Sequence, residues 1–175
     1  MISMGKILFA KQGGVHVLKF VGDVRVTFSP TLSDFLAGIG NSKDQKSIVI
    51  DLTETLNIDS TSLGLLVKIS LRSQETLGVK PTIVSTNEDI NRILHSMGFE
   101  KVFVILDRTI TKCEDLSALP TQSVSESALR EQVLQAHKTL MELNEKNRAC
   151  FCDLVEALEK EQSEDSHNST VRKAG

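Results

Sequence analysis

The sequence lacks several features that define whole classes of protein. Among its 175 residues there is no tryptophan or tyrosine, and seven phenylalanines are the only aromatic residues. Lysine and arginine are scattered without a basic block, so neither a phosphate-tracking groove nor a base-stacking platform is indicated. We therefore expect no nucleic-acid partner. The net charge of −3 and the hydrophobic content of 40% are those of an ordinary soluble protein.

Signals for membranes, export and disulfides are also missing. No apolar run reaches the length of a membrane span, and residues 1–11 lack the pattern of a secretory signal. The cysteines are Cys113, Cys150 and Cys152, an odd number that fits reduced thiols better than a disulfide framework. We expect a cytoplasmic protein with no membrane partner.

Motifs for cofactors and metals are absent from the sequence. It contains no Gly-Lys-Ser/Thr phosphate loop and no Gly-x-Gly-x-x-Gly turn, so no cofactor is predicted. Cys150 and Cys152 lie two positions apart on a predicted helix, where their side chains point to nearly opposite sides. They are interpreted as packing residues, and no metal site is predicted.

What is present is an alternation of strand-like and helix-like segments. Residues 6–11 and 15–20 are short β-like runs separated by a Gly pair, which is typical of a hairpin. Residues 47–52 form a continuous aliphatic run, as expected for a strand covered on both faces. Further helices are predicted over residues 31–39, 61–77 and 86–97, and further strands over 82–85 and 102–106. This order predicts parallel pairing, and so an α/β fold with a small mixed β-sheet and packed helices.

The C-terminal third has a different pattern. Residues 1–116 form the predicted domain, 117–125 a Ser-rich linker, 126–162 a helical extension, and 163–175 a disordered tail. A heptad seam is predicted through Leu129, Val133, Ala136, Leu140, Leu143, Asn147, Cys150, Leu154 and Ala157. A single helix over residues 126–161 would be roughly 50 Å long. Its apolar stripe must pack on the same chain folded back near residues 144–147, on a second copy, or on another protein.

A cluster of small hydroxyl residues follows the aliphatic strand. It consists of Asp59, Ser60, Thr61 and Ser62, where a helix begins. The simplest interpretation is that Asp59 or Ser60 caps this helix. A catalytic serine would need the flanking glycines of a nucleophile elbow, which are missing. It would also need a base, and nothing in the spacing of His16, His95, His137 or His167 requires any of them to reach Ser60. We therefore predict no catalytic residue and no enzyme.

Gly64 interrupts the first turns of an otherwise good helix, at a cost of about 1 kcal/mol relative to alanine. Two interpretations remain open. The glycine allows either close packing on the sheet or the approach of a partner's backbone.

These residues resemble a known family signature. The stretch Ile48-Val49-Ile50-Asp51-Leu52 followed by Ile58-Asp59-Ser60-Thr61-Ser62-Leu63-Gly64-Leu65-Leu66 resembles that of STAS domains, in anti-sigma factor antagonists of the SpoIIAA type. Those proteins read Asp-Ser-Ser-Gly-Leu-Gly here, and the serine after Asp accepts a phosphate. Residues 90–99 look like the family's second landmark, a helix leading to a Gly-aromatic turn. The similarity covers about residues 6–113.

The resemblance implies site residues. It makes Ser60 the phosphorylation site, with Thr61 and Ser62 as secondary candidates because Ser62 replaces the family's glycine. It implies a partner-binding surface made of Asp59, Ser60, Thr61, Ser62, Leu63, Gly64 and Leu65.

The resemblance also implies a function, that of a bacterial anti-anti-sigma factor in a partner-switching pathway. The unphosphorylated protein would bind an anti-sigma factor, a serine kinase would release it, and a PP2C-type phosphatase would reverse the modification. The C-terminal helix resembles the extension of HsbA-type antagonists, and it is expected to bind a second partner or to self-associate.

Two other functions stay open. A STAS-fold structural or regulatory subunit of a transporter, or of another complex, would bind its partner without phosphorylation control. A ligand-binding or hydrolytic α/β domain would place a pocket with a histidine or carboxylate near Ser60.

Overall fold

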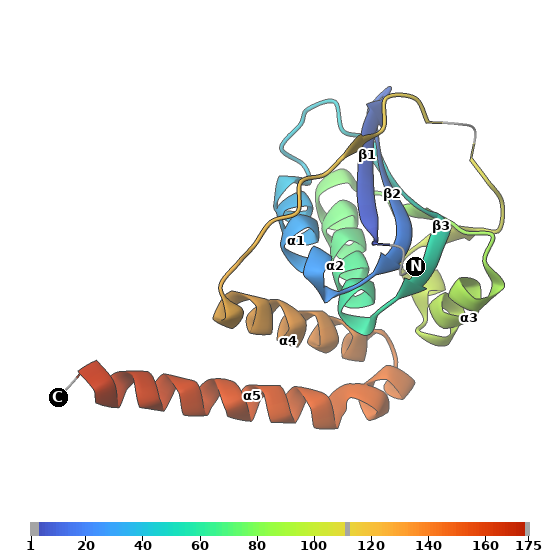
Figure 1. The fold of residues 1–175 in the computed structure, drawn as a ribbon. Coiled ribbons are helices and arrows are strands. Elements are labelled where there is room, and N and C mark those ends of the chain that lie inside the picture. The colour runs from blue at the N-terminus through green and yellow to red at the C-terminus, as the bar shows by residue number, and fades with distance from the viewer. Residues whose placement is uncertain (1–3, 111–112, 174–175) are drawn as a thin grey trace.

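A six-stranded mixed sheet forms the centre of the molecule, in the strand order β5-β4-β3-β2-β1-β6 (Figure 1). The structure is a computed structural model that describes residues 4–110 and 113–173. The strands are β1 (Lys6–Gln12), β2 (Val15–Val24), β3 (Ser47–Ile58), β4 (Thr82–Val84), β5 (Val104–Leu106) and β6 (Ser117–Ala118). The helices are α1 (Ser29–Gly38), α2 (Ser60–Leu77), α3 (Glu88–Ser96), α4 (Glu126–Leu143) and α5 (Glu145–Lys173), with 3-10 turns η1 (Val26–Phe28) and η2 (Phe99–Lys101).

The predicted α/β fold class with a mixed sheet is confirmed. β1 and β2 form the expected antiparallel hairpin, and its turn uses Gly13 and Gly14 at φ values of 54° and 85°. A positive φ of this kind favours glycine, which has no Cβ. β2, β3, β4 and β5 pair in parallel, with helices in the crossovers between successive strands from β2 onward. β6 adds an antiparallel strand outside β1, within the segment predicted as a linker.

The core is aliphatic, as the shortage of aromatic residues predicts. α1 and α2 lie side by side and pack on the sheet (Figure 1). The fully buried side chains include Leu18, Phe20, Leu32, Ile50, Leu52, Leu66 and Phe99. Strand β3 runs six residues beyond the predicted end at Leu52, because its pairing with β2 continues as far as Ile58 through two register shifts. This continuation carries the chain to the hydroxyl cluster.

The C-terminal segment is a helical hairpin, so one of the three predicted packing alternatives, folding back near residues 144–147, is the one found. Asn144 has an extended backbone (φ −164°, ψ 165°), which ends α4. Its side-chain oxygen accepts a hydrogen bond from the Asn147 N–H at 2.8 Å and thereby caps α5. α5 then lies alongside α4 in the reverse direction and extends beyond it (Figure 1).

The single heptad seam holds at Asn147, which is buried, but is wrong for the rest of the second helix. α5 buries Asn147, Phe151 and Val155, whereas Leu154 is 42% exposed and Cys150 is also exposed. The helical phase is interrupted at Asn144, because this residue is extended. A heptad seam counted continuously through it therefore selects the wrong face of α5.

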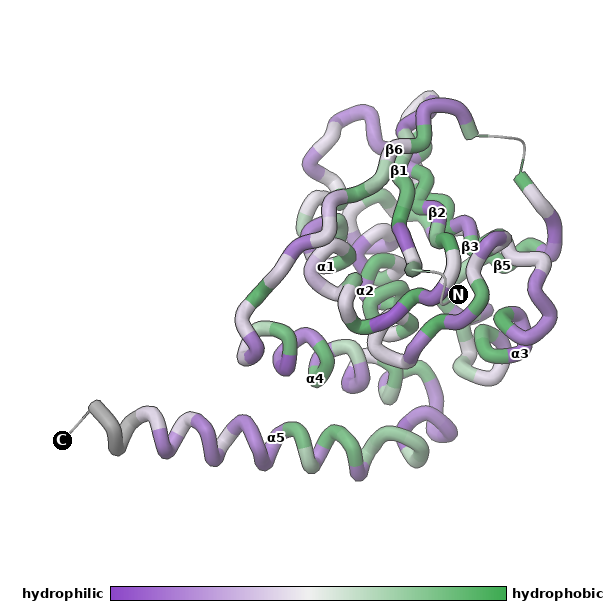
Figure 2. Tube along the Cα trace, viewed as in Figure 1, coloured by the Kyte–Doolittle hydropathy of each residue, from purple (hydrophilic) through white to green (hydrophobic). Residues whose placement is uncertain are grey.

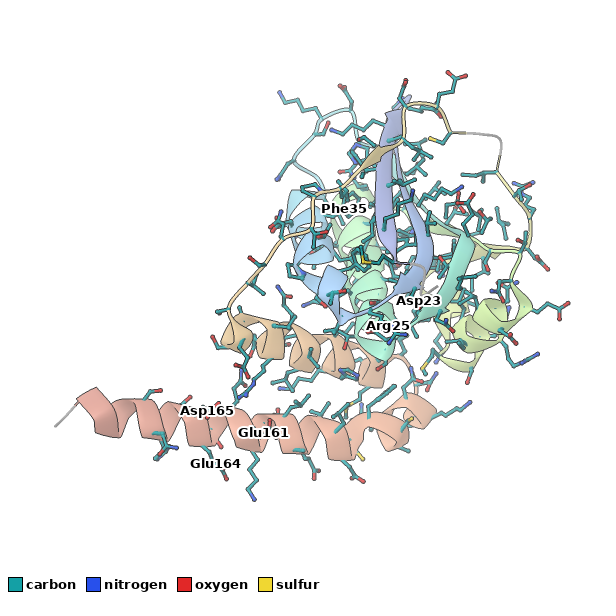
Figure 3. All side chains as sticks on the ribbon, in the orientation of Figure 1. Asp23, Arg25, Phe35, Glu161, Glu164 and Asp165 are labelled. Carbon is teal, nitrogen blue, oxygen red and sulfur yellow. The ribbon has the colours of Figure 1, made fainter. Side chains whose placement is uncertain are left out.

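The segment predicted as a disordered tail, residues 163–175, is helical as far as Lys173, and residues 174–175 lie outside the described part of the chain. Figure 2 shows that α5 is hydrophilic at the turn, mostly apolar over the next part of the helix and hydrophilic again toward its C-terminal end. Figure 3 shows Glu161, Glu164 and Asp165 on that polar part. In residues 4–110 and 113–173, no helix combines the length and apolar character needed to cross a bilayer.

Candidate functional site

Asp59 links the ends of two strands to the start of α2. Its Oδ1 accepts a hydrogen bond from the Ser62 N–H at 2.8 Å, which is the predicted helix cap. Its Oδ2 accepts from the Val26 N–H at 2.6 Å, and its own N–H donates to the Val24 carbonyl at 3.0 Å. Both carboxylate oxygens therefore bind backbone N–H groups, and the N-terminus of α2 is held against the end of β2.

The end of β2 also brings charged side chains to this region, as Figure 3 shows for Asp23 and Arg25. Asp23 accepts a hydrogen bond from Asn57 at 2.8 Å and pairs with Arg25 at 3.6 Å. Arg25 is mostly exposed. Sequence reasoning did not select either residue, because neither belongs to the hydroxyl cluster.

Ser60 is the first residue of α2, and its hydroxyl group is engaged. Its Oγ lies 2.9 Å from Nε2 of His137, a residue of α4. The other ring nitrogen, Nδ1, lies 2.8 Å from the Val133 carbonyl oxygen, which can only accept a hydrogen bond. Nδ1 therefore donates to this carbonyl, and Nε2 is the ring nitrogen that shares a hydrogen bond with the Ser60 hydroxyl.

The contact with His137 is the main residue-level feature that the sequence did not predict. His137 is only 3% exposed, and its ring meets that of Phe151 edge-on with centroids 5.2 Å apart. It lies 77 positions from Ser60 in the chain. No local pattern signals such a contact, because it depends on how the C-terminal hairpin docks.

The predicted partner-binding residues are brought together at the N-terminal end of α2, but they are not an open surface. Asp59 and Ser60 are half-buried. The others are buried, with relative exposures of 6% for Thr61, 0% for Ser62, 2% for Leu63 and 1% for Leu65, and Gly64 is buried as well. The partner-binding surface that the resemblance implies is therefore largely covered in the structure.

The two secondary candidates are the least accessible hydroxyl groups of the cluster. Thr61 and Ser62 are both buried. The Ser62 Oγ has no hydrogen-bond partner among the residues that the structure describes. A buried hydroxyl without a partner costs about 1–3 kcal/mol. Of the three hydroxyl residues, Ser60 is the most accessible because it is half-buried.

Gly64 settles the question that the sequence left open. A Cβ built on Gly64 would lie 2.2 Å from the carbonyl oxygen of Ala136 and 2.8 Å from its Cα. Ala136 belongs to α4 and is fully buried. The glycine thus permits the close approach of another backbone, but that backbone is neither the sheet nor a partner, the two predicted alternatives: it is helix α4 of the same chain.

The alternative of a ligand-binding or hydrolytic domain made two predictions about the surroundings of Ser60, and the structure agrees with one of them. It predicts a histidine near Ser60, and His137 is within hydrogen-bonding distance. It also predicts a pocket there, but His137 is covered by α4 and α5. A cavity of about 550 Å³ lies farther along α2, lined by Leu36, Ala37, Lys68, Leu71, Arg72, Glu75 and Thr139 and not by Ser60.

The described residues hold no cluster of three or more His, Cys, Asp or Glu side chains that could bind a metal ion. The cysteines Cys113, Cys150 and Cys152 are all free.

Comparison with known proteins identifies the domain. The family model for the STAS domain matches residues 6–115. The chain therefore belongs to the STAS domain family, as the motif around Ser60 predicted.

A solved structure described as an anti-sigma factor antagonist from Mycobacterium paratuberculosis has the same fold. It is 20% identical in sequence with a TM-score of 0.50, and the match covers 58% of this chain and 85% of that chain. At this identity the likeness concerns the fold. The family model stops at residue 115, so α4 and α5 lie outside the family-defined domain.

Proposed function

We propose that this protein is an anti-sigma factor antagonist in a partner-switching pathway, with Ser60 as its phosphorylation site. The observation that carries the proposal is the position of Ser60 in a STAS domain. It is the first residue of α2, directly after the capping residue Asp59. Of the three hydroxyl residues in the cluster, Ser60 is the one that is not buried.

A phosphate at this position would be tolerated by the free protein. Residues at a helix N-terminus lie near unpaired N–H groups and the positive end of the helix dipole, which favour a negative charge. The first turn of α2 contains no acidic side chain. A phosphate on Ser60 would therefore be stabilised by the helix, although Asp59 beside it adds repulsion.

The same phosphate would oppose docking of a partner. It adds a charge of about −1.5 to −2, next to the carboxylate of Asp59. A partner that covers this surface would have to remove the phosphate from water without neutralising it. A hundredfold loss of affinity requires only about 2.7 kcal/mol, which is small compared with the cost of burying an unpaired charge.

The proposal assigns partners by role. The unphosphorylated protein binds an anti-sigma factor, which also acts as the serine kinase or works with one, and a PP2C-type phosphatase restores the unphosphorylated form. The protein is then a cytoplasmic regulator of transcription that binds other proteins and catalyses no reaction itself. Family membership and the fold support this role.

The test uses purified full-length protein and each anti-sigma factor kinase of the source organism. After incubation with ATP, peptide mass spectrometry should find phosphate on Ser60. Ser60→Ala should bind the anti-sigma factor and resist phosphorylation, and Ser60→Glu should bind at least about tenfold more weakly. Ser123→Glu, which places the same charge in an exposed coil, is the matched control.

Phosphate found only outside residues 59–62 would contradict the proposal. Equal binding by Ser60→Glu and the unmodified protein would favour the alternative of a structural or regulatory subunit, for example of a transporter, without phosphorylation control.

A further inference from the structure

Helix α4 lies directly on the residues assigned to partner binding. It crosses the N-terminal part of α2 (Figure 1), and its buried residues are Leu134, Ala136, His137 and Leu140. The Ser60 hydroxyl is hydrogen-bonded to Nε2 of His137, and Ala136 lies over Gly64. The end of α2 that a partner would have to reach is therefore occupied by the chain's own helix.

The fit between the two helices is specific at the crossing point. The closest approach is between backbones, since a Cβ on Gly64 would overlap the Ala136 carbonyl oxygen. Small residues on both helices allow this distance. The surface around Gly64 is thus shaped to receive a helix.

The covering helix is an addition to the domain. The STAS match ends at residue 115, before α4 begins. Residues 121–125, which connect the domain to α4, are all exposed. Without residues 126–173, the surface of α2 at Gly64 and Ser60 would face solvent.

α4 and α5 are paired with each other in a single helical unit. Lys138 pairs with Glu159, and Arg130 pairs with Asp165 at 2.7 Å, so the two helices are joined along their length. Phe151 of α5 packs against the His137 ring.

Few polar contacts hold the turn of the hairpin to the domain. Lys101 Nζ donates to the Leu143 carbonyl at 2.7 Å, Lys146 Nζ donates to Ser96 Oγ at 2.7 Å, and Asn147 Nδ2 donates to the Met97 carbonyl at 2.9 Å. The two lysine contacts are exposed to solvent and are therefore weak.

We propose that α4 is an intramolecular cover of the partner-binding surface, and that the anti-sigma factor binds only after the α4–α5 hairpin has moved away. This inference rests on the proposed function, because it concerns access to the same site. The apparent affinity for the partner is then the intrinsic affinity multiplied by the fraction of open molecules. A kinase acting on Ser60 meets the same requirement, since the hydroxyl group is bonded to His137 in the closed form.

The test displaces α4 by a substitution in α4 itself, so that the residues of α2 stay unchanged. Ala136→Glu places a carboxylate at a position with 0% exposure, so α4 can no longer dock. The matched control is Ala157→Glu, the same substitution at an exposed alanine of α5. Hydrogen–deuterium exchange of the full-length variants reports opening, and titration with the purified anti-sigma factor reports affinity.

If the inference is right, the amide hydrogens of α4 and of the first turns of α2 exchange faster in Ala136→Glu than in the wild type, while those of the central strands stay protected. The variant binds the anti-sigma factor at least about tenfold more tightly, because it no longer has to open. Ala157→Glu behaves like the wild type in both measurements. If Ala136→Glu is open but binds the anti-sigma factor no more tightly than the wild type does, the inference that α4 covers the binding surface is wrong. Unchanged exchange of α4 would also contradict it.

Failure of the proposed function looks different. In that case neither the wild type nor the opened variant binds any anti-sigma factor, although the exchange data show opening.

If the sheet amides of Ala136→Glu also lose protection, the variant is unfolded more widely, and the inference is tested by hydrogen exchange of the wild-type protein instead. Saturating anti-sigma factor should accelerate exchange of α4 amides, and unchanged or increased protection of α4 would refute the cover.

Discussion

Replacing Gly64 with alanine tests the closest contact in the molecule. In a free helix this change is stabilising by about 1 kcal/mol, because alanine has the higher helix propensity. Here the new methyl carbon would lie 2.2 Å from the Ala136 carbonyl oxygen and 2.6 Å from the carbonyl carbon. The obstructing atoms belong to a backbone, so no side-chain rotation can relieve the overlap.

The size of the effect follows from the distance. Ordinary contact requires a separation of about 3.5 Å, so α4 has to withdraw by about 1 Å, and a gap of that size loses a quarter to a half of the dispersion energy along the interface. Overpacking of this kind costs about 1–3 kcal/mol. After the gain in helix propensity of about 1 kcal/mol we expect a net loss of up to about 2 kcal/mol, or a midpoint of thermal unfolding lower by up to about 6 °C.

Gly38→Ala is the matched control for this measurement. Gly38 is the last residue of α1, and a Cβ built on it meets no atom within 4 Å. This variant should be neutral or more stable by a few tenths of a kcal/mol. Calorimetry gives the midpoints, and hydrogen exchange shows whether α4 is released. A Gly64→Ala protein as stable as Gly38→Ala, with α4 equally protected, would refute the described crossing of α2 and α4.

Three further variants test separate features. Ser62→Ala removes a buried hydroxyl without a partner and should raise the free energy of unfolding by about 1 kcal/mol in urea titration; a clear loss would mean that the hydroxyl has a partner in solution. Asn147→Ala deletes two 2.9 Å bonds to carbonyls in a site that is 1% exposed and should lower that free energy by about 2 kcal/mol, whereas exposed Asn168→Ala should change it little. Burial, and secondarily Lys11, lower the pKa of His16 from 6.5, so the unfolded chain takes up the proton first. Stability should therefore be constant above about pH 6.5 and fall below it; His16→Gln should lose this part of the pH dependence, and exposed His167→Gln should keep it.

Local patterns predicted the domain well, because its elements are fixed by neighbouring residues. The Gly pair predicted the β1–β2 hairpin, and the hydroxyl cluster before an apolar helix predicted a cap by Asp59 or Ser60, which Asp59 provides by accepting from the Ser62 N–H. Gly78 ends α2 in the left-handed conformation, as its position after the last helical residue indicated. The family motif covers the same region, and the match to residues 6–115 confirms it.

The docking of the extension could not be predicted, because an apolar stripe does not say what it packs against. The fold-back near residues 144–147 was one of three alternatives, and only the structure selects it. The heptad count failed beyond Asn144 because a single extended residue changes the phase of everything that follows. The partner of Ser60 was missed for the same reason, since His137 reaches it only through the docked hairpin.

The short strand β6 limits how far the α4–α5 hairpin can move from the domain, because it fixes the point at which the connection to α4 begins. Beyond it, the Leu119 N–H donates to the Ile7 carbonyl at 2.9 Å and the Pro120 carbonyl accepts from Thr31 at 3.1 Å. The tether that remains free is residues 121–125, with a reach of about 18 Å. A released α4 would stay at an effective concentration in the millimolar range. A soluble partner present at micromolar concentration therefore competes with a tethered helix whose effective concentration is about a thousandfold higher. Lengthening the tether with Gly-Ser repeats would lower the effective concentration of α4 and so favour binding of the partner.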